Sequence, residues 1–247
     1  MPSYEKLDRF YDGAMGDRTE MASYIHRLIR RHKPQARTLL ELACGTGAIL
    51  KILAKSYDVA GLDRSPQMLS LARKKLPHVR WYRKDMIRFD LATKFDVIIC
   101  VFDSINHVLK FADWQKIFRN AARHLAHGGL FLFDINTEAK LERLINAPTR
   151  VHKFGRNLEF INVTDGRRGI ANWNIRVFEH RRGNKYGLFE EDIKEISFPV
   201  NKIKAALRNQ FTNVKVIDSL GRKPSTKSDR LYFICKKSRT EKPIEAV

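Results

Sequence analysis

The chain has 247 residues, of which 43% are hydrophobic, 30% charged and 10% aromatic, a composition that excludes disorder, collagen-like repeats and coiled coils. The length fits one large α/β domain, or one domain with a modest insertion. The 47 Lys and Arg against 27 Asp and Glu give a net charge of +20, divided as +8 over residues 1–100, +2 over 101–150 and +10 over 151–247. This excess indicates either a face that binds nucleic acid or a general bias of the surface.

No apolar run reaches the roughly 18 residues that a membrane-spanning helix needs, and residues 1–6 contain no apolar stretch typical of a secretory signal. The three cysteines, Cys44, Cys100 and Cys235, are odd in number and far apart, so they predict neither a disulfide framework nor a metal cluster. A cytoplasmic protein without a bound metal is expected.

Residues 37–136 alternate short apolar runs with helical patterns, which is typical of a parallel sheet with crossover helices and predicts the core of the domain. We expect residues 1–36 to form a helical cap on this core. The expected strands are residues 38–43, 57–63, 79–83, 95–101 and 130–135. The expected helices are residues 48–55, 66–75 with Ser65 as N-cap, and 112–125 with Gly128-Gly129 as stop signal.

After Asn136 three segments have strand-like composition and are separated by turn sequences: residues 150–162, 170–181 and 186–198. They predict an antiparallel insertion over residues 149–198. A helix at 200–209 and strands at 214–218 and 231–235 complete residues 199–237, and 238–247 are expected to be a frayed tail. The predicted fold is a single α/β domain, a Rossmann-like doubly wound, mostly parallel seven-stranded sheet with an antiparallel β insertion after the fifth strand.

The loop after the first expected strand, Glu41-Leu42-Ala43-Cys44-Gly45-Thr46-Gly47, is rich in small residues that allow close approach of a ligand to the backbone. Asp63 ends the second expected strand, where a carboxylate can accept both hydroxyls of a ribose. The alternative is an ordinary tight turn beside an acidic helix cap. The loop lacks the third glycine of a dinucleotide site, and no Gly-Lys-[Ser/Thr] of a phosphate loop follows.

This loop, with Gly61-Leu62-Asp63-Arg64-Ser65-Pro66-Gln67-Met68-Leu69 following it, resembles the class I S-adenosylmethionine-dependent methyltransferases. Lys84-Asp85-Met86, residues 95–107 and residues 125–131 resemble later motifs of the family in order and spacing. One departure is Ala43, which stands where many members carry the first glycine.

The resemblance implies S-adenosyl-L-methionine as cofactor and S-adenosyl-L-homocysteine as product. In the family the glycine loop receives the methionine part, the acid after the second strand holds the ribose, and a carboxylate with the next N–H reads the adenine. The implied cofactor-binding residues are Tyr11, Arg18, Glu41, Ala43, Cys44, Gly45, Gly47, Asp63, Arg64, Met68, Asp85, Met86 and Val101.

Within the family, the Ala-Cys-Gly-Thr-Gly loop, the Asp-Met pair and the late insertion resemble the small-molecule N-methyltransferase branch. This branch includes amino-sugar N,N-dimethyltransferases, uncharacterised bacterial relatives and, more distantly, glycine N-methyltransferase. There a tyrosine and a basic residue near the N-terminus close over the methionyl end, which points to Tyr11 and Arg18. The alternatives are a half-buried aromatic residue for Tyr11 and a solvated surface charge for Arg18.

Two side chains after the fourth expected strand are candidate catalytic residues. His107 is a candidate proton acceptor, because the ordinary pKa of histidine is about 6.5. The alternative is a polar loop residue whose ring forms hydrogen bonds with the backbone. Asp103 either attracts an ammonium group of the acceptor or caps the following segment. Methyl transfer is an in-line displacement in which the enzyme mainly holds the nucleophile close to the methyl group.

The insertion is expected to cover the acceptor pocket, to form a dimer surface, or both, so the oligomeric state is either monomer or homodimer. Its Trp173, Phe178, His180 and Tyr186 either pack against a substrate ring or form the core of the inserted sheet. The leading functional hypothesis is methyl transfer to a small molecule, on an amine nitrogen. Alternatives are an RNA or protein methyltransferase that uses the basic surface, a nicotinamide oxidoreductase, and a non-catalytic cofactor-binding relative.

Overall fold

The computed structural model of the chain describes residues 7–238. A seven-stranded sheet forms its core in the order β10-β11-β5-β4-β1-β2-β3, parallel except that β11 runs antiparallel to both β5 and β10. The strands are β1 (Thr38–Leu42), β2 (Asp58–Asp63), β3 (Arg80–Arg83), β4 (Phe95–Cys100), β5 (Leu125–Asn136), β10 (Asn213–Asp218) and β11 (Arg230–Lys236). The predicted fold class is confirmed.

Helices cover both faces of this sheet because alternate residues of each buried strand point to opposite sides. Ile98 and Cys100 of β4 pack with α5 and α7, whereas Val97 and Ile99 pack with α2 and α3. The helices are α1 (Asp8–Met15), α2 (Thr19–His32), α3 (Ala48–Leu53), α4 (Pro66–Lys75), α5 (Phe111–His124), α6 (Glu138–Ile145), α7 (Val200–Arg208) and the 3-10 turn η1 (Ser104–His107).

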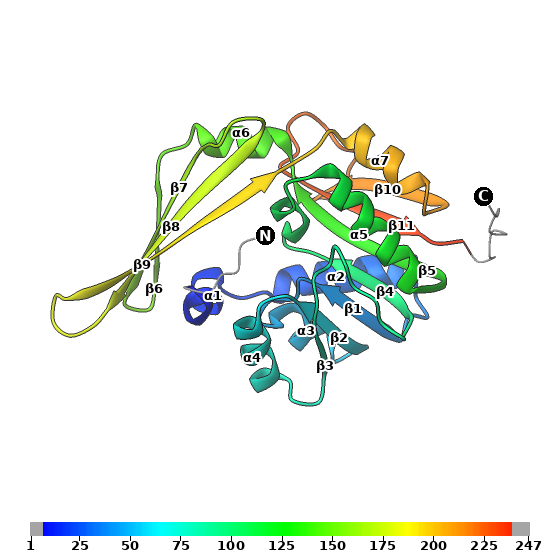
Figure 1. The fold of residues 1–247 in the computed structure, drawn as a ribbon, viewed down its shortest axis with the longest axis horizontal. Coiled ribbons are helices and arrows are strands. Elements are labelled where there is room, and N and C mark those ends of the chain that lie inside the picture. Colours follow the sequence, from blue (N-terminus) through cyan, green and yellow to red (C-terminus); the bar gives the residue numbers. More distant parts are fainter. Residues whose placement is uncertain (1–6, 239–247) are drawn as a thin grey trace.

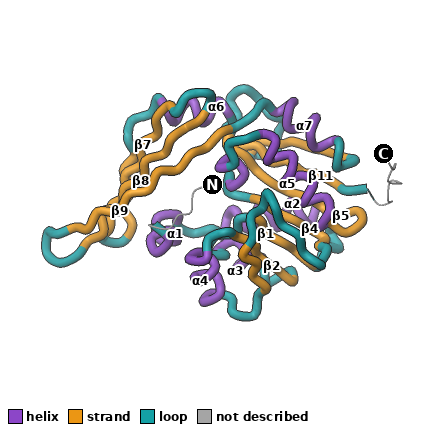
Figure 2. The backbone as a smooth tube through the Cα atoms, in the orientation of Figure 1, coloured by secondary structure: helices purple, strands orange, loops and turns teal. Residues whose placement is uncertain are grey.

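A separate antiparallel sheet follows β5 in the chain, in the order β6-β7-β8-β9. Its strands are β6 (Arg150–Phe154), β7 (Asn157–Asp165), β8 (Ile170–His180) and β9 (Tyr186–Ile196). In Figure 1 this sheet extends away from the seven-stranded sheet, and in Figure 2 it consists of strands and turns while helices flank the core. It corresponds to the predicted insertion, which we call the inserted sheet.

Helix α1 packs against the inserted sheet. Leu7 and Phe10 share an apolar cluster with Ile175, Val177 and Ile193. The predicted N-terminal cap therefore bridges the inserted sheet and the core. Residues 1–6 and 239–247 of the predicted cap and tail lie outside the described residues, and Ser238, which the prediction places in the tail, accepts a hydrogen bond from the N–H of Gly128.

Three local predictions were wrong. The predicted strand 150–162 is two strands, because Gly155 adopts a left-handed φ of 57° in a tight turn between β6 and β7. Gly128-Gly129 does not separate α5 from β5, since β5 begins at Leu125 and the pairing with β4 shifts register between Phe95 and Val97. Helix α6 was missed, although Thr137 caps it by accepting a hydrogen bond from the N–H of Lys140.

The predicted cap of α4 is confirmed, because the Ser65 hydroxyl accepts a hydrogen bond from the N–H of Met68. Cys44, Cys100 and Cys235 are buried free thiols. Within residues 7–238, every helix is too short or too polar to cross a membrane.

Candidate functional site

A cavity of about 530 Å³ lies between the carboxyl ends of the core strands and the inserted sheet. The carboxyl edge of a parallel sheet is where doubly wound proteins bind ligands. One part of its wall comes from α1 and the loops after β1, β2 and β3, and the rest from η1, α6, β11 and the inner face of the inserted sheet. We call these the core side and the insertion side of the cavity.

The glycine loop on the core side turns through three left-handed residues. The φ angles are 53° at Ala43, 52° at Gly45 and 71° at Gly47. Glycine adopts such angles without steric cost, whereas alanine does so at roughly 1 kcal/mol, so the substitution at Ala43 strains the loop slightly. A Cβ on Gly45 would meet only a ring carbon of Tyr11, at 4.0 Å, so the backbone here is open to a ligand.

Asp63 connects the loop to the end of β2. Its carboxylate accepts hydrogen bonds from the N–H groups of Gly45, at 2.8 Å, and Ser65, at 2.9 Å. Burial raises the pKa of the Asp63 carboxyl, and these N–H groups act against the rise. A buried acid held by backbone donors at the mouth of the cavity fits a ligand with hydroxyl groups.

The N-terminal helix closes the core side. Asp12 of α1 accepts a hydrogen bond from the Thr46 hydroxyl at 2.6 Å and forms an ion pair with Lys75. Arg18 stacks on the ring of Phe102 at 3.9 Å, and its buried Nη2 atom has no hydrogen-bond partner among residues 7–238. Burial raises the pKa of the Tyr11 hydroxyl well above its usual range.

The structure brings ten of the fifteen predicted site residues to the cavity wall. They are Tyr11, Arg18, Ala43, Gly45, Asp63, Arg64, Met68, Met86, Asp103 and His107. The other five, Glu41, Cys44, Gly47, Asp85 and Val101, are not in the wall.

Each of these five has a local reason to lie elsewhere. Glu41 and Cys44 are buried behind the loop, and Val101 is buried in the core. A Cβ on Gly47 would lie 2.7 Å from the Trp81 ring, so this glycine allows close packing. The Asp85 carboxylate accepts a hydrogen bond from the N–H of Ile87 at 2.8 Å.

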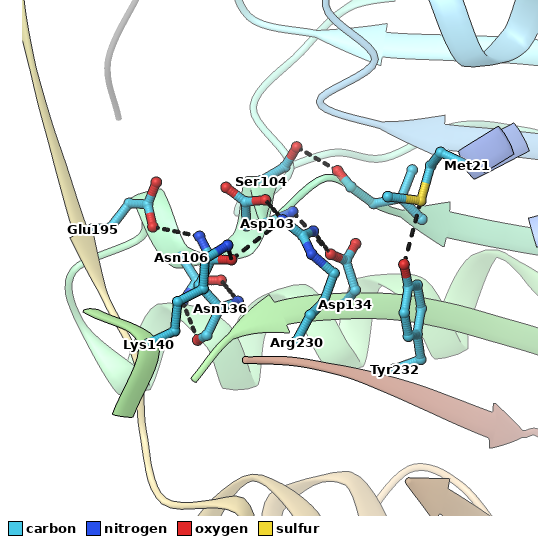
Figure 3. A network of polar contacts seen from close by, with 11 residues as sticks. Met21, Asp103, Ser104, Asn106, Asp134, Asn136, Lys140, Glu195, Arg230 and Tyr232 are labelled. Carbon is cyan, nitrogen blue, oxygen red and sulfur yellow. Dashed lines mark hydrogen bonds and ion pairs between the residues drawn. The ribbon is translucent and has the colours of Figure 1, made fainter. Parts of the chain in front are cut away.

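The chain leaves β4 through two further left-handed residues, Phe102 and Asp103, with φ of 64° and 52°. The Asp103 carboxylate forms an ion pair with Arg230, which also pairs with Asp134 (Figure 3). Burial is the largest influence on the pKa of Asp103 and raises it, but the charges of Arg230, Lys140 and His107 together with the hydrogen bond from Arg230 outweigh burial, and the net shift is downward. Asp103 is therefore a charged group that Arg230 already neutralises.

His107 is buried on η1, and its Nδ1 lies 3.3 Å from the carbonyl oxygen of Lys194 in the inserted sheet. A carbonyl can only accept, so Nδ1 carries the hydrogen and Nε2 has the lone pair. Burial lowers the pKa of the His107 imidazole, which keeps the ring neutral near pH 7.

Sequence reasoning missed several residues on the insertion side, because each belongs to a different element. They are Asn136, Lys140, Glu159, Glu195 and Arg230. Of the four aromatic or imidazole side chains that we considered for contact with a substrate ring, Trp173 lines the cavity. Phe178, His180 and Tyr186 do not. The sequence could have distinguished Trp173 from Phe178. The two residues are five positions apart on β8, and residues an odd number of positions apart face opposite sides of a strand.

Comparison with known proteins agrees with this geometry. Residues 39–129 match the model of the methyltransferase domain. The dTDP-3-amino-3,6-dideoxy-alpha-D-glucopyranose N,N-dimethyltransferase of Streptomyces fradiae is 34% identical over 53% of this chain and 51% of its own length. The dTDP-3-amino-3,4,6-trideoxy-alpha-D-glucopyranose N,N-dimethyltransferase of Streptomyces venezuelae is 36% identical over 51% of this chain and 54% of its own length.

These alignments span about half the length of the two curated relatives. Among solved structures, an S-adenosylmethionine-dependent methyltransferase from Clostridium acetobutylicum ATCC 824 superimposes with a TM-score of 0.82, at 25% identity, over 95% of this chain and 96% of its own. The chain thus has the fold of the class I S-adenosylmethionine-dependent methyltransferases. Residues 39–129 carry the methyltransferase domain of this fold, and the relatives of the chain in sequence include amino-sugar N,N-dimethyltransferases.

Proposed function

We propose that this S-adenosylmethionine-dependent methyltransferase transfers the methyl group to the amine nitrogen of a small molecule. The observation that carries the proposal is one cavity with two chemically different sides. The core side has the loop and acid that suit a nucleoside with an amino-acid tail. The insertion side adds further space in the same cavity, in which a second molecule can lie against the first.

On the core side, Asp63 is proposed to hold the ribose hydroxyls and the loop at Gly45 the methionine part. The buried Nη2 of Arg18 fits this cofactor, because a guanidinium nitrogen with no hydrogen-bond acceptor among the described residues suits the carboxylate of the methionine part. Met86 is part of the cavity wall and Asp85 is not, so we assign the adenine contact to the N–H of Met86.

On the insertion side, Ile161, Trp173, Ile175 and Ile193 present an apolar surface that excludes water from the acceptor. The bound cofactor supplies an electrophilic methyl group on a sulfonium. The residues of the chain then have to hold an uncharged nitrogen in line with it. The neutral His107 ring can accept a hydrogen bond from an amine, which orients the nitrogen lone pair.

The proposal is tested by incubating the protein with methyl-labelled S-adenosylmethionine and a panel of amines, amino sugars, carboxylic acids and bulk tRNA. Transfer to a small amine, with none to tRNA, is the expected result. Labelling of tRNA, or of carboxylic acids alone, would contradict it. Salt-sensitive binding of tRNA at about 50 mM salt would support the alternative of an RNA methyltransferase.

The basic surplus of residues 151–247 does not gather around the cavity. Arg181, Arg182 and Lys185 occupy the β8–β9 turn and are absent from the cavity wall. Figure 1 shows this hairpin extending away from the core. The wall itself takes one Arg, one His and two Glu from residues 151–247, namely Arg230, His152, Glu159 and Glu195. The basic surplus of residues 151–247 therefore gives no support to a nucleic-acid substrate at the cavity.

A further inference from the structure

Three buried carboxylates gather at the end of β5, and they differ in what neutralises them. Asp103 and Asp134 share the guanidinium of Arg230. Glu195, near the end of β9, is 3% exposed and forms no ion pair within residues 7–238. Its carboxylate Oε2 accepts a hydrogen bond from the uncharged amide of Asn136, at 2.9 Å. Of the three, Glu195 alone forms no ion pair among the described residues.

The orientation of the Asn136 amide is fixed by its other contacts. Its Oδ1 atom accepts hydrogen bonds from Lys140 Nζ at 2.7 Å and from an Arg230 nitrogen at 3.2 Å. Two cationic donors require an oxygen at this position, so the amide nitrogen must face Glu195 (Figure 3). Lys140 and Arg230 thus contact Glu195 through the neutral amide of Asn136 and form no direct ion pair with it.

Glu195 also lies on the side of the cavity that we assign to the acceptor. It is part of the cavity wall, and its carboxylate, the His107 ring and the Asp103 carboxylate each place a ligand atom within 4.8 Å of the others. An ammonium group in this space would contact the neutral imidazole of His107 and a carboxyl, that of Glu195, which forms no ion pair within residues 7–238.

We propose that Glu195 binds the protonated form of the acceptor amine and takes the proton that must leave before methylation. This inference rests on the proposed function and names the substrate as an amine that arrives as a cation. The ammonium gives one proton to the Glu195 carboxylate and becomes a neutral amine. Its lone pair forms the N–C bond while the S–C bond pair returns to sulfur, which loses its positive charge. The methylated ammonium then departs, and Glu195 releases its proton to water.

The surroundings of Glu195 bring the pKa of its carboxyl closer to that of an amine. Burial, reinforced by the charge of Asp103, raises the pKa of Glu195 to about 8, and Lys140 and Arg230 act against the rise. His107 faces it from η1, and the register partner on β8 is the uncharged Ala171. A carboxyl with this pKa can exchange a proton with an amine at little cost, whereas Asp103 cannot because Arg230 holds it ionised.

The experiment follows the titration of Glu195 itself. Protein labelled with ¹³C at the glutamate carboxyls is saturated with S-adenosylhomocysteine, and the Glu195 signal is assigned as the one lost in Glu195→Gln. The probes are glucosamine, 2-aminoethanol and benzylamine, each compared with its uncharged counterpart, N-acetylglucosamine, ethylene glycol or benzyl alcohol. At least one amine should lower the pKa of Glu195 by about one unit or more, and no uncharged counterpart should do so.

The control is Glu190→Gln, which makes the same change on the same strand at an exposed residue that pairs with Arg176 outside the cavity wall. It should leave the titration of Glu195 and its response to amines unchanged. A titration that none of the amines moves, or that the uncharged compounds move equally, overturns the proposal. Calorimetric binding of S-adenosylhomocysteine is measured separately, so its loss would instead point to failure of the proposed function.

Discussion

The core side and the insertion side of the cavity differ in how far apart in the sequence their contacting residues lie. On the core side, the contacts join the loop after β1 to the end of the neighbouring strand β2, as in the bonds from Gly45 and Ser65 to Asp63. On the insertion side, Glu195, Asn136, Lys140 and Arg230 come from four elements and form one network. A binding loop can therefore be encoded by a short sequence motif, whereas a pocket built from distant elements cannot.

The largest effect is expected at Asp63. Asp63→Ala should weaken binding of S-adenosylhomocysteine by about 100-fold or more, because two charge-assisted hydrogen bonds to the ribose are lost. The control is Asp58→Ala at the exposed start of the same strand, where the carboxylate pairs with Arg80. Calorimetric titration of both variants provides the measurement. Wild-type affinity in Asp63→Ala would mean that the core side does not hold the ribose.

The second effect is a loss of stability when the close packing of the glycine loop against Trp81 is disturbed. Gly47→Ala should lower the free energy of unfolding by about 2–4 kcal/mol, because the added methyl meets both left-handed strain and the Trp81 ring at 2.7 Å. Gly155→Ala has similar strain, at φ 57°, with nothing within 4 Å, and should cost about 1 kcal/mol. Urea unfolding compares the two variants. Equal losses would show that Trp81 does not restrict position 47.

The third effect is a pH dependence on the insertion side. The pKa of Glu195 is raised from 4.5 to about 8 by folding, so the folded state binds more protons than the unfolded state between these values. Stability from Glu195 is therefore complete below pH 4.5 and is lost as the pH rises toward 8. Between pH 6 and 7 this loss should approach about 1 kcal/mol in the wild type and be absent in Glu195→Gln.

Chemical unfolding at several pH values measures this difference. His107, whose pKa is lowered, contributes in the opposite direction, but it is present in both proteins and cancels in the comparison. A wild-type profile that parallels that of Glu195→Gln would be evidence that Glu195 is ionised throughout, and would remove the support that its pKa lends to proton transfer.

The smallest effect is expected at the basic β8–β9 turn. Arg182→Ala and Lys185→Ala, separately or together, should leave binding of S-adenosylhomocysteine and methyl transfer to small amines unchanged, because this turn is not part of the cavity wall. A loss of methyl transfer in the double variant, with cofactor binding intact, would indicate an acceptor that reaches far beyond the cavity.

The sequence predictions were more accurate for the core side of the cavity than for the insertion side. Gly45, Asp63 and Ser65 were found because strand, loop, acid and helix cap are consecutive in the chain, so their spacing fixes their geometry. Glu195 was missed because a glutamate in an alternating strand has no local signal, and only the approach of β9 to η1 brings it beside His107. Helix α6 and the turn at Gly155 were predictable from Thr137 with its following leucines and from the glycine itself.

The most direct test of the central claim is a crystal structure of the protein with S-adenosylhomocysteine. We predict that both ribose hydroxyls lie within hydrogen-bond distance, about 3 Å, of the Asp63 carboxylate. The sulfur should face the space between His107 and Glu195. A nucleoside bound outside the cavity, or a sulfur directed away from Glu195, would contradict the account.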